Sequence, residues 1–213
     1  MNLLASLKLK ACTIAGAPTK VTQLPSPLNH PQANNMQTRH SLFLIGFMGS
    51  GKSYWGKIIA SRLVLPFLDL DEWIMEKQEK TIAQIFDEQG ETGFRLIERD
   101  ALRLLADLPV QVIATGGGTP CFFDNMDWMN QHGTTIFLNT PPTLLAERLR
   151  GEKEFRPLLR SVQDVDLLDF IIKKLEERAE FYLQANIILE QIVGDEEFLE
   201  KLVARVQGRV TSP

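Results

Sequence analysis

Consecutive residues at positions 46–53 form the strongest chemical pattern in this chain, reading Gly-Phe-Met-Gly-Ser-Gly-Lys-Ser. They complete a Gly-x-x-x-x-Gly-Lys-Ser phosphate loop. Its glycines permit positive φ angles, so backbone N–H groups at a helix start can approach an anion closely. Lys52 adds a mobile charge for the β- and γ-phosphates, and the Ser53 hydroxyl can ligate Mg²⁺. The loop predicts a nucleoside triphosphate site with these candidate contacts: Gly49, Ser50, Gly51, Lys52, Ser53 and Tyr54.

Apolar patterning on both sides of the loop supplies the elements that must position it. A buried strand is predicted over Ser41–Ile45 and a helix over Tyr54–Leu63, which is the context that such a motif requires. Further strands are predicted at Leu65–Asp71, Val110–Ala114, Thr134–Leu138 and Asn186–Leu189. Helical periodicity marks Asp71–Lys80, Thr81–Gln89, Glu91–Ala106, Pro141–Leu149, Val165–Leu183 and Glu196–Val206. Alternating helices and continuously apolar strands predict a three-layer, doubly wound α/β fold with a parallel sheet.

Two carboxylates, Asp69 and Asp71, follow the second predicted strand directly. Ligands of such sheets bind beyond the carboxyl ends of the strands, so both side chains are expected in the cleft of the phosphate loop. One carboxylate would hold Mg²⁺ through water, and the other would receive or orient an acceptor hydroxyl. The competing interpretation is that they are solvated helix caps, with Asp71 capping the helix that follows.

Other segments fit an anionic acceptor. Arg95 can bind a carboxylate through two parallel hydrogen bonds, and Glu98 on the same helix face can orient it. The competing interpretation, which is the commoner one for such a pair, is an ion pair on the protein surface. Gly116, Gly117 and Gly118 follow a strand and offer backbone N–H groups, or simply make a tight turn. Arg156 lies in a charged loop that could close as a mobile lid over the transferring phosphate, or remain a solvated loop.

Composition excludes several classes of protein. The 213 residues suit one α/β domain, and a net charge of −4 argues against a general basic field for nucleic acid. No apolar stretch approaches a membrane span. Cys12 and Cys121 form no Cys-x-x-Cys pair, which fits a reducing cytoplasm. The sequence lacks the Asn-Lys-x-Asp motif that GTPases use to bind the base. Asp69 and Asp71 follow soon after the first predicted helix, which is earlier in the chain than expected for the Walker-B carboxylate of a motor ATPase.

Residues 1–39 differ from the rest, since they contain no Asp or Glu and cluster proline with asparagine. They are interpreted as a disordered extension or a mis-called start, because their signal for a transit peptide is poor. The predicted domain therefore spans residues 40–207, and residues 208–213 are a flexible tail.

The combination of motifs resembles the shikimate kinase family over residues 41 to about 190. The matching motifs occur in the family's order and spacing: Gly46–Ser53, Asp69-Leu70-Asp71, Gly90-Glu91-x-x-Phe94-Arg95-x-x-Glu98, Gly116-Gly117-Gly118 and Arg156-Pro157-Leu158-Leu159. The resemblance implies a nucleoside-monophosphate-kinase-like five-stranded sheet of order 2-3-1-4-5 with a mobile lid. It also implies ATP-dependent, Mg²⁺-requiring phosphorylation of the shikimate 3-hydroxyl.

The resemblance also implies roles for individual residues. Asp71 would be the partner of the shikimate hydroxyl and the base, and Asp69 would contact Mg²⁺ through water beside Ser53. Lys52 and Arg156 would stabilise charge on the transferring phosphoryl group, with Arg156 as the lid arginine. The shikimate site would comprise Arg95 and Arg178 on the carboxylate, Gly116, Gly117 and Gly118 through backbone N–H groups, and Phe86 and Phe94 as an apolar wall. Arg148 is the best candidate to stack on adenine, although its register against Arg150 stays open.

Two alternatives compete with this hypothesis. A gluconate-type kinase would share the loop and lid but would not need Arg95 and Arg178 as a pair. A silent paralogue that binds nucleotide would be expected to have lost Asp71, Arg95 or Arg156, and all are present. The chain shows no leftover apolar seam, so a monomer is expected.

Overall fold

The computed structural model of this chain describes residues 40–151, 156–160, 162–191 and 195–210. The predicted extension 1–39 lies outside the described residues, as does the end of the predicted tail at 211–213. Helix α7 (Asp195–Val210) continues into the first part of that tail.

A five-stranded parallel sheet forms the centre of the fold, with the order β2-β3-β1-β4-β5. Its strands are β1 (Ser41–Ile45), β2 (Phe67–Asp69), β3 (Val112–Ala114), β4 (Gly133–Asn139) and β5 (Ile187–Glu190). This arrangement confirms the predicted fold class and strand order. The parallel register brings the ends of β2 and β3 together, since Asp69 lies opposite Ala114. The residues that follow these two strands therefore meet at one edge of the sheet.

Most predicted helices are present, with shifted ends. The described helices are α1 (Lys52–Leu63), α2 (Leu70–Gln78), α3 (Ile82–Leu104), α4 (Asn125–His132), α5 (Pro142–Leu149), α6 (Leu167–Tyr182) and α7. Short 3₁₀ turns are η1 (Leu105–Asp107), η2 (Thr119–Cys121) and η4 (Pro157–Leu159). Gly90 interrupts α3 with φ 68° and ψ −179°, so the two helices predicted on either side of it are separate helical segments joined by a kink.

The structure differs from the sequence expectations in one strand and in one additional helix. The strand predicted over Leu65–Asp71 is only Phe67–Asp69, because α2 already begins at Leu70. Helix α4 was not predicted, since its sequence Asn-Met-Asp-Trp-Met-Asn-Gln-His lacks a regular apolar stripe. It buries Met126 and Met129, and the buried Asn125 donates through Nδ2 to the Thr119 carbonyl at 2.9 Å.

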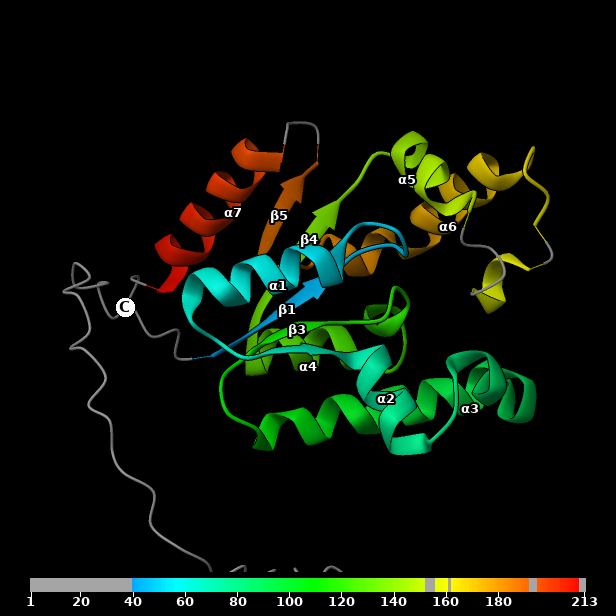
Figure 1. The fold of residues 1–213 in the computed structure, drawn as a ribbon, viewed down its shortest axis with the longest axis horizontal. Coiled ribbons are helices and arrows are strands. Elements are labelled where there is room, and N and C mark those ends of the chain that lie inside the picture. Colours follow the sequence, from blue (N-terminus) through cyan, green and yellow to red (C-terminus); the bar gives the residue numbers. More distant parts are fainter. Residues whose placement is uncertain (1–39, 152–155, 161, 192–194, 211–213) are drawn as a thin grey trace, which may run out of the picture. The chain divides into compact units, whose positions relative to one another are not determined.

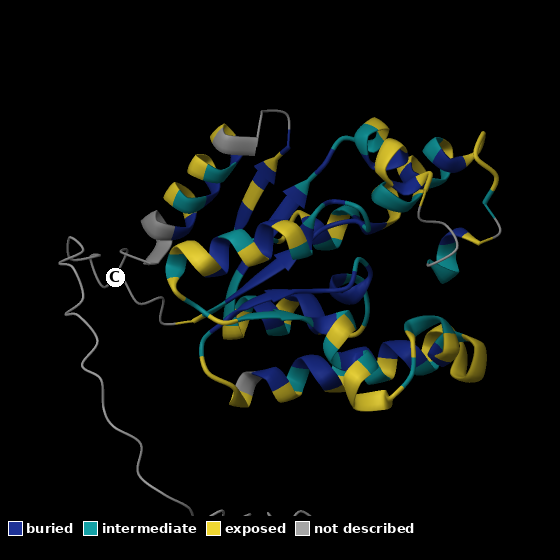
Figure 2. Cartoon of the chain, viewed as in Figure 1, coloured by how far each residue is buried: buried dark blue, intermediate teal, exposed yellow. Residues whose placement is uncertain are grey.

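Apolar cores on both faces of the sheet make the three layers (Figure 1). On one face, α1 and α7 pack against the strands through residues such as Trp55, Ile59 and Phe198. On the other face, α2, α3, α4 and α6 surround Phe43, Ile113 and Phe137. Figure 2 shows β1, β3 and β4 buried along most of their length, whereas β5 and the helices alternate between buried and exposed residues. This rigid sheet holds the loops at its carboxyl edge.

A separate apolar cluster anchors the segment beyond α5. Leu159 of η4 is fully buried and packs with Phe47, Leu149 and Ile171 from the phosphate loop, α5 and α6. The described residues 156–160 are therefore attached to the domain beside the phosphate loop. Among the described residues, each helix is too short or too polar to cross a membrane.

Candidate active site

The phosphate loop has the backbone geometry that its glycines predict. Gly46, Gly49 and Gly51 have φ angles of 146°, 79° and 85°, and Gly51 is the N-cap of α1. Lys52 is nearly buried and donates through Nζ to the carbonyls of Gly46 (3.0 Å) and Phe47 (2.9 Å). Burial lowers the pKa of Lys52 to about 8, although Asp71 and Asp69 oppose that shift. An anion bound at the loop would raise this pKa again, because a nearby negative charge favours the charged form of lysine.

A cavity of about 390 Å³ lies over this loop and fits a nucleotide. It collects nearly all of the predicted nucleotide contacts: Gly49, Gly51, Lys52, Ser53, Tyr54, Arg148 and Arg156. Ser50 is the exception, because it is fully buried beneath the loop and its N–H donates to the Phe47 carbonyl. Arg148 and Arg150 are both exposed, but Arg148 is the one that lines the cavity, and its Nη1 donates to the Gly49 carbonyl at 3.0 Å.

The two oxygen ligands predicted for a metal lie side by side. Ser53 Oγ donates to Asp69 Oδ2 at 2.5 Å, and both residues line the nucleotide cavity. Asp69, not Asp71, caps α2, since its Oδ1 accepts from the N–H groups of Asp71 (3.1 Å) and Glu72 (3.4 Å). Hydroxyl and carboxylate oxygens suit Mg²⁺, which takes only one or two protein ligands when phosphates supply others. The donor set therefore fits Mg²⁺.

Asp71 lies one residue into the first turn of α2 and has the most perturbed carboxylate of the site. Its Oδ1 is buried and has no hydrogen-bond partner in the described part of the chain. Burial raises the pKa of Asp71 to about 7, with further upward contributions from Glu98 and Asp69. A carboxyl group with this pKa is suited to accept a proton near neutral pH.

Arg95 and Glu98 form a buried pair on α3. Arg95 Nη1 donates to Glu98 Oε2 at 2.9 Å, and the other guanidinium nitrogen, Nη2, donates to Glu91 Oε1 at 3.0 Å. The guanidinium also lies over the Phe122 ring, 4.4 Å from its centre. Thr119 Oγ1 donates to Glu98 Oε1 at 2.5 Å. The alternative interpretation of Arg95 and Glu98 as an exposed surface ion pair is therefore wrong, because both side chains are buried in the site.

The three consecutive glycines after β3 are required by close packing. A Cβ on Gly116 would lie 2.4 Å from Glu98 Oε1, and one on Gly118 would lie 2.6 Å from Arg95 Nη2. A Cβ on Gly117 would lie 2.9 Å from the backbone nitrogen of Met48, in the phosphate loop. None of the three has a positive φ angle. The backbone of residues 116–118 thus lies in close contact with the Arg95–Glu98 pair on one side and with the phosphate loop on the other.

Helix α6 holds the same segment from the other side. The carbonyl of Gly117 accepts from Arg178 Nη1 at 3.1 Å and from Tyr182 Oη at 2.6 Å. Both side chains are buried, and the Arg178 guanidinium lies 5.2 Å from the centre of the Phe47 ring. Sequence reasoning missed Tyr182. Its spacing of four residues from Arg178 places both on one helix face, which is the signal that could have indicated it.

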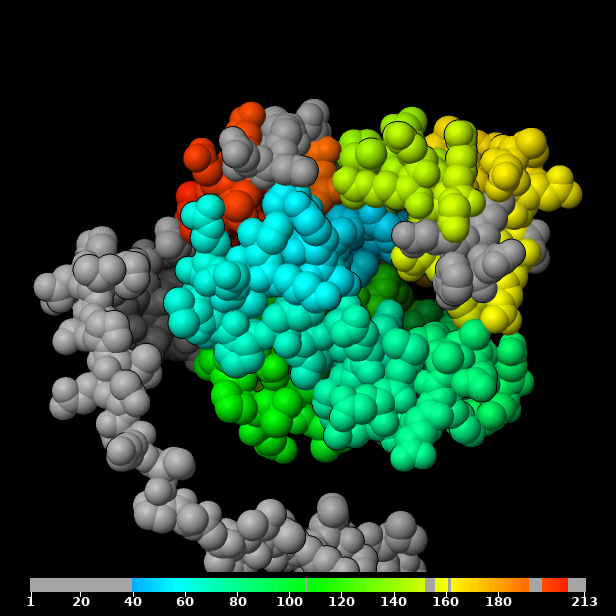
Figure 3. All heavy atoms as spheres, in the orientation of Figure 1, coloured from blue at the N-terminus to red at the C-terminus, as the bar shows by residue number. Residues whose placement is uncertain are grey.

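A second cavity, of about 130 Å³, collects every predicted acceptor contact. Its predicted members are Asp71, Phe86, Phe94, Arg95, Gly116, Gly117, Gly118 and Arg178. Ile82, Pro157 and Leu158 also line it and were not predicted as contacts. Four residues line both this cavity and the nucleotide cavity: Met48, Asp71, Gly117 and Arg156. The two cavities therefore meet at a carboxylate and a guanidinium. Figure 3 shows the surface hollowed between the yellow segment that contains residues 156–160 and the green-cyan helices α2 and α3.

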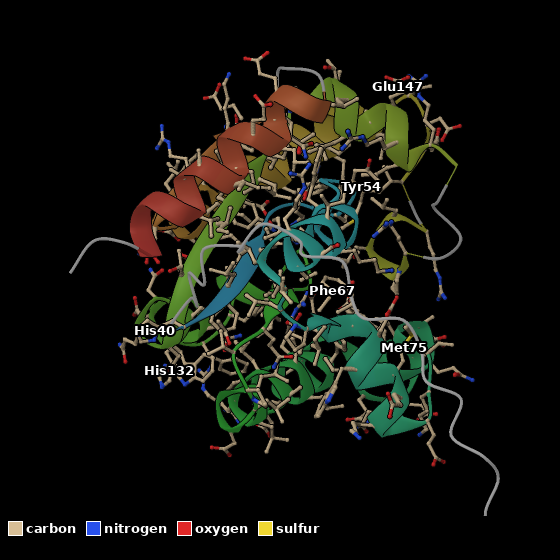
Figure 4. The ribbon with its side chains drawn as sticks, turned by 60° about the vertical axis from the view of Figure 1, so that its left-hand side comes forward. His40, Tyr54, Phe67, Met75, His132 and Glu147 are labelled. Carbon is tan, nitrogen blue, oxygen red and sulfur yellow. The ribbon has the colours of Figure 1, made fainter. Side chains whose placement is uncertain are left out.

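Among the described residues, no histidine lines either of the two cavities. Figure 4 shows His40 and His132 near the starts of β1 and β4, while Tyr54 lies toward the opposite end of the sheet. Burial raises the pKa of the Cys121 thiol to about 11, so it is not a thiolate at neutral pH. Within the described residues, a carboxylate is therefore the base that the geometry offers.

Comparison with known proteins identifies the family. Residues 48–207 match the family described as "SKI: Shikimate kinase". The chain belongs to the shikimate kinase family. The shikimate kinase of Bacteroides thetaiotaomicron is 47% identical over 167 residues, which cover 78% of this chain and 95% of that protein. This membership confirms the resemblance seen in the sequence and makes the chain an ATP-dependent kinase with an alcohol acceptor.

Solved shikimate kinases share the architecture. The crystal structure of the Bacteroides thetaiotaomicron enzyme aligns with a TM-score of 0.73 at 45% identity, covering 81% of this chain and 99% of that one. The Acinetobacter baumannii shikimate kinase in complex with shikimate aligns with a TM-score of 0.75 at 30% identity, covering 81% and 96%. The similarity thus extends over nearly the whole of both solved proteins.

Proposed function

We propose that this chain transfers the γ-phosphoryl group of ATP to the 3-hydroxyl of shikimate, giving shikimate 3-phosphate and ADP. The observation that carries the proposal is the junction of the two cavities at Asp71 and Arg156. A phosphoryl group held by the phosphate loop and a hydroxyl in the acceptor cavity would meet at this junction. Family membership and the shikimate complex of a relative support the acceptor.

Asp71 accepts the proton of the attacking hydroxyl. The hydroxyl oxygen forms a bond to the γ-phosphorus, the bond from that phosphorus to the β,γ-bridging oxygen breaks, and ADP leaves. Asp71 Oδ1 is buried without a partner in the described structure, and the pKa of about 7 leaves it ready to take the proton. This transfer needs no other base.

Arg95 and Arg178 bind the carboxylate of shikimate, which is the end that does not react. Both guanidinium groups are buried and fixed by other contacts, so little side-chain entropy is lost on binding. Phe86 and Phe94 pack together with ring centres 4.8 Å apart and form the apolar wall. Backbone N–H groups of Gly116, Gly117 and Gly118 bind hydroxyl groups of the acceptor. A gluconate-type acceptor would not need the paired arginines.

Lys52 and Arg156 stabilise negative charge that spreads over the γ-phosphoryl oxygens. Ser53 and Asp69 would hold Mg²⁺ beside the phosphate loop. When bound, Mg²⁺ neutralises charge on the β- and γ-phosphates. The segment around Arg156 acts as a lid that excludes water as it closes. Arg148 and Tyr54 contact the adenosine end of ATP at the rim of the nucleotide cavity.

We also propose that the protein works as a monomer in the cytoplasm, without nucleic acid or a membrane surface as a partner. The net charge of −4 argues against a nucleic-acid partner, and the lack of a Cys-x-x-Cys pair in the sequence fits a reducing compartment.

The test is release of ADP from MgATP by the purified protein, with and without shikimate, and with gluconate or a nucleoside monophosphate as controls. Shikimate alone is expected to stimulate ADP release. Equal or greater stimulation by gluconate would overturn the acceptor assignment. Nucleotide binding without stimulation by any acceptor would favour a silent paralogue instead.

A further inference from the structure

Gln191, the residue after β5, connects the phosphate loop, the residue after β4 and helix α5. Its Nε2 donates to the Ser50 carbonyl of the phosphate loop at 3.0 Å. Its Oε1 accepts from Thr140 Oγ1 at 2.9 Å and from Arg148 Nη1 at 3.2 Å. Gln191 is only 8% exposed, and its backbone N–H donates to the Asn139 carbonyl at 2.9 Å. The sheet therefore fixes the backbone, and three contacts fix the side chain.

The chemistry of these partners allows only one orientation of the amide. Arg148 can only donate, so it must face Oε1, and the Ser50 carbonyl can only accept, so it must face Nε2. Reversing the amide would place two donors together and two acceptors together. The Gln191 side chain therefore links the carbonyl of the loop to the guanidinium at the cavity rim in a defined way.

The hydrogen bond to Ser50 has a consequence on the opposite side of the peptide group. In a trans peptide, the carbonyl of one residue and the N–H of the next point in opposite directions. No cis peptide occurs in the described chain, so holding the Ser50 carbonyl directs the Gly51 N–H away from Gln191. Gly51 lines the nucleotide cavity and caps α1. Gln191 thus sets the direction of one N–H donor in the phosphate loop.

We propose that Gln191 is a positioning residue for nucleotide binding, which fixes the Gly51 N–H and the Arg148 guanidinium in one arrangement before ATP arrives. This inference rests on the proposed roles of the phosphate loop and Arg148. Gln191 does not line the acceptor cavity. Its loss should weaken the binding of nucleotides and leave the binding of shikimate unchanged.

The experiment measures the dissociation constant of MgADP by titration calorimetry, together with the KM values for ATP and shikimate. Gln191→Met keeps the length of the side chain and removes its hydrogen bonds. Gln191→Glu keeps the acceptor for Thr140 and Arg148 but sets a carboxylate against the Ser50 carbonyl. Gln184→Met is the matched control, because Gln184 is exposed and its side chain contacts only the Glu180 carbonyl among the bonds described for it.

Both Gln191 variants are expected to raise the Kd for MgADP and the KM for ATP about tenfold, with the KM for shikimate unchanged. The control variant should match the unaltered protein.

A double variant tests whether the two side chains act together. In the Arg148→Met background, Gln191→Met should cause a smaller loss of MgADP affinity than in the unaltered protein, because part of its effect acts through Arg148. Unchanged MgADP affinity, or equal losses for both substrates, would overturn the inference. If Gln191→Met does not fold, the MgADP affinity and the KM values of Gln191→Glu test the inference instead. The binding of MgADP requires no acceptor. The measured MgADP affinity therefore tests the role of Gln191 even if the protein does not phosphorylate shikimate.

Discussion

Arg95 and Glu98 form a buried ion pair one turn apart on α3, in which Arg95 Nη1 donates to Glu98 Oε2 over 2.9 Å. The Arg95 side chain is 5% exposed and that of Glu98 is fully buried. Removal of either partner would leave an uncompensated buried charge, which typically costs about 3–5 kcal/mol. Truncation of Arg95 to alanine would therefore mix a loss of stability with any loss of acceptor binding, and a charge-preserving variant gives a cleaner test.

Arg95→Lys is expected to raise the KM for shikimate about tenfold or more, with a smaller effect on kcat. Lysine keeps the charge near Glu98 but cannot contact Glu98, Glu91 and a substrate carboxylate together. Steady-state kinetics with varied shikimate at saturating ATP would measure the change. An unaltered KM for shikimate would rule out the carboxylate role of Arg95.

Glu98→Gln should move the pH dependence of the reaction. Glu98 is the charge that contributes most to the raised pKa of Asp71, after burial itself. In the unaltered protein, kcat/KM should fall as the pH drops through about 7, since a protonated Asp71 cannot accept a proton. Without the neighbouring negative charge, the pKa of Asp71 should fall, and the acid limb should shift to lower pH. The profile of kcat/KM against pH measures this, and a limb at the same or higher pH would contradict it.

Asp71→Asn should lower kcat by about a hundredfold or more, because asparagine cannot accept the proton. It should also stabilise the unliganded protein at high pH. Asp71 has a folded pKa raised from 3.8 to about 7, so its contribution to stability is present below pH 3.8 and is lost as the pH rises through 7. At pH 8, the variant should therefore gain about 1–3 kcal/mol relative to the parent protein.

Thermal unfolding at pH 5 and pH 8 measures this second effect. The difference in Tm between variant and parent should be several degrees larger at pH 8, because about 1 kcal/mol corresponds to about 2–4 °C in a protein of this size. A difference in Tm that is the same at both pH values would show that the ionised Asp71 does not disfavour the fold.

Arg156→Ala should reduce kcat by about a hundredfold, with little change in the KM for shikimate, because Arg156 acts on charge that develops in the transition state. Arg160→Ala is the matched control on the same segment. Arg160 is 43% exposed in its side chain and pairs with Asp87 at 3.4 Å, and it lines neither cavity of the site. Comparable losses of kcat in both variants would indicate a structural effect of the segment.

Gly118→Ala should raise the KM for shikimate about tenfold, because its Cβ would lie 2.6 Å from Arg95 Nη2 and displace the guanidinium. Gly151→Ala is the control, since a Cβ there meets nothing within 4 Å. The comparison uses kinetics with varied shikimate. If the two alanine variants behave alike, the close packing of Gly118 on Arg95 does not hold the acceptor site.

Local patterns in the sequence were sufficient for the elements that carry the chemistry. The spacing of Gly46, Gly49, Gly51, Lys52 and Ser53 predicted the positive φ angles and the start of a helix, because these depend on neighbouring residues alone. Continuous apolar strands predicted a parallel sheet. Ser50 is assigned to the nucleotide because of its place in the motif, and this assignment stays a prediction, since packing buries the side chain.

Tertiary structure decided what surrounds those elements. The sequence by itself determined the phosphate loop, the paired carboxylates, Arg95 with Glu98, and the membership in a family. Only the fold showed that Asp69 rather than Asp71 caps α2, that Arg148 rather than Arg150 faces the nucleotide cavity, and that Gln191 and Tyr182 hold loops distant in sequence. A backbone motif is encoded by adjacent residues. Burial, a shifted pKa and a hydrogen bond across 141 positions depend on which elements the sheet brings together.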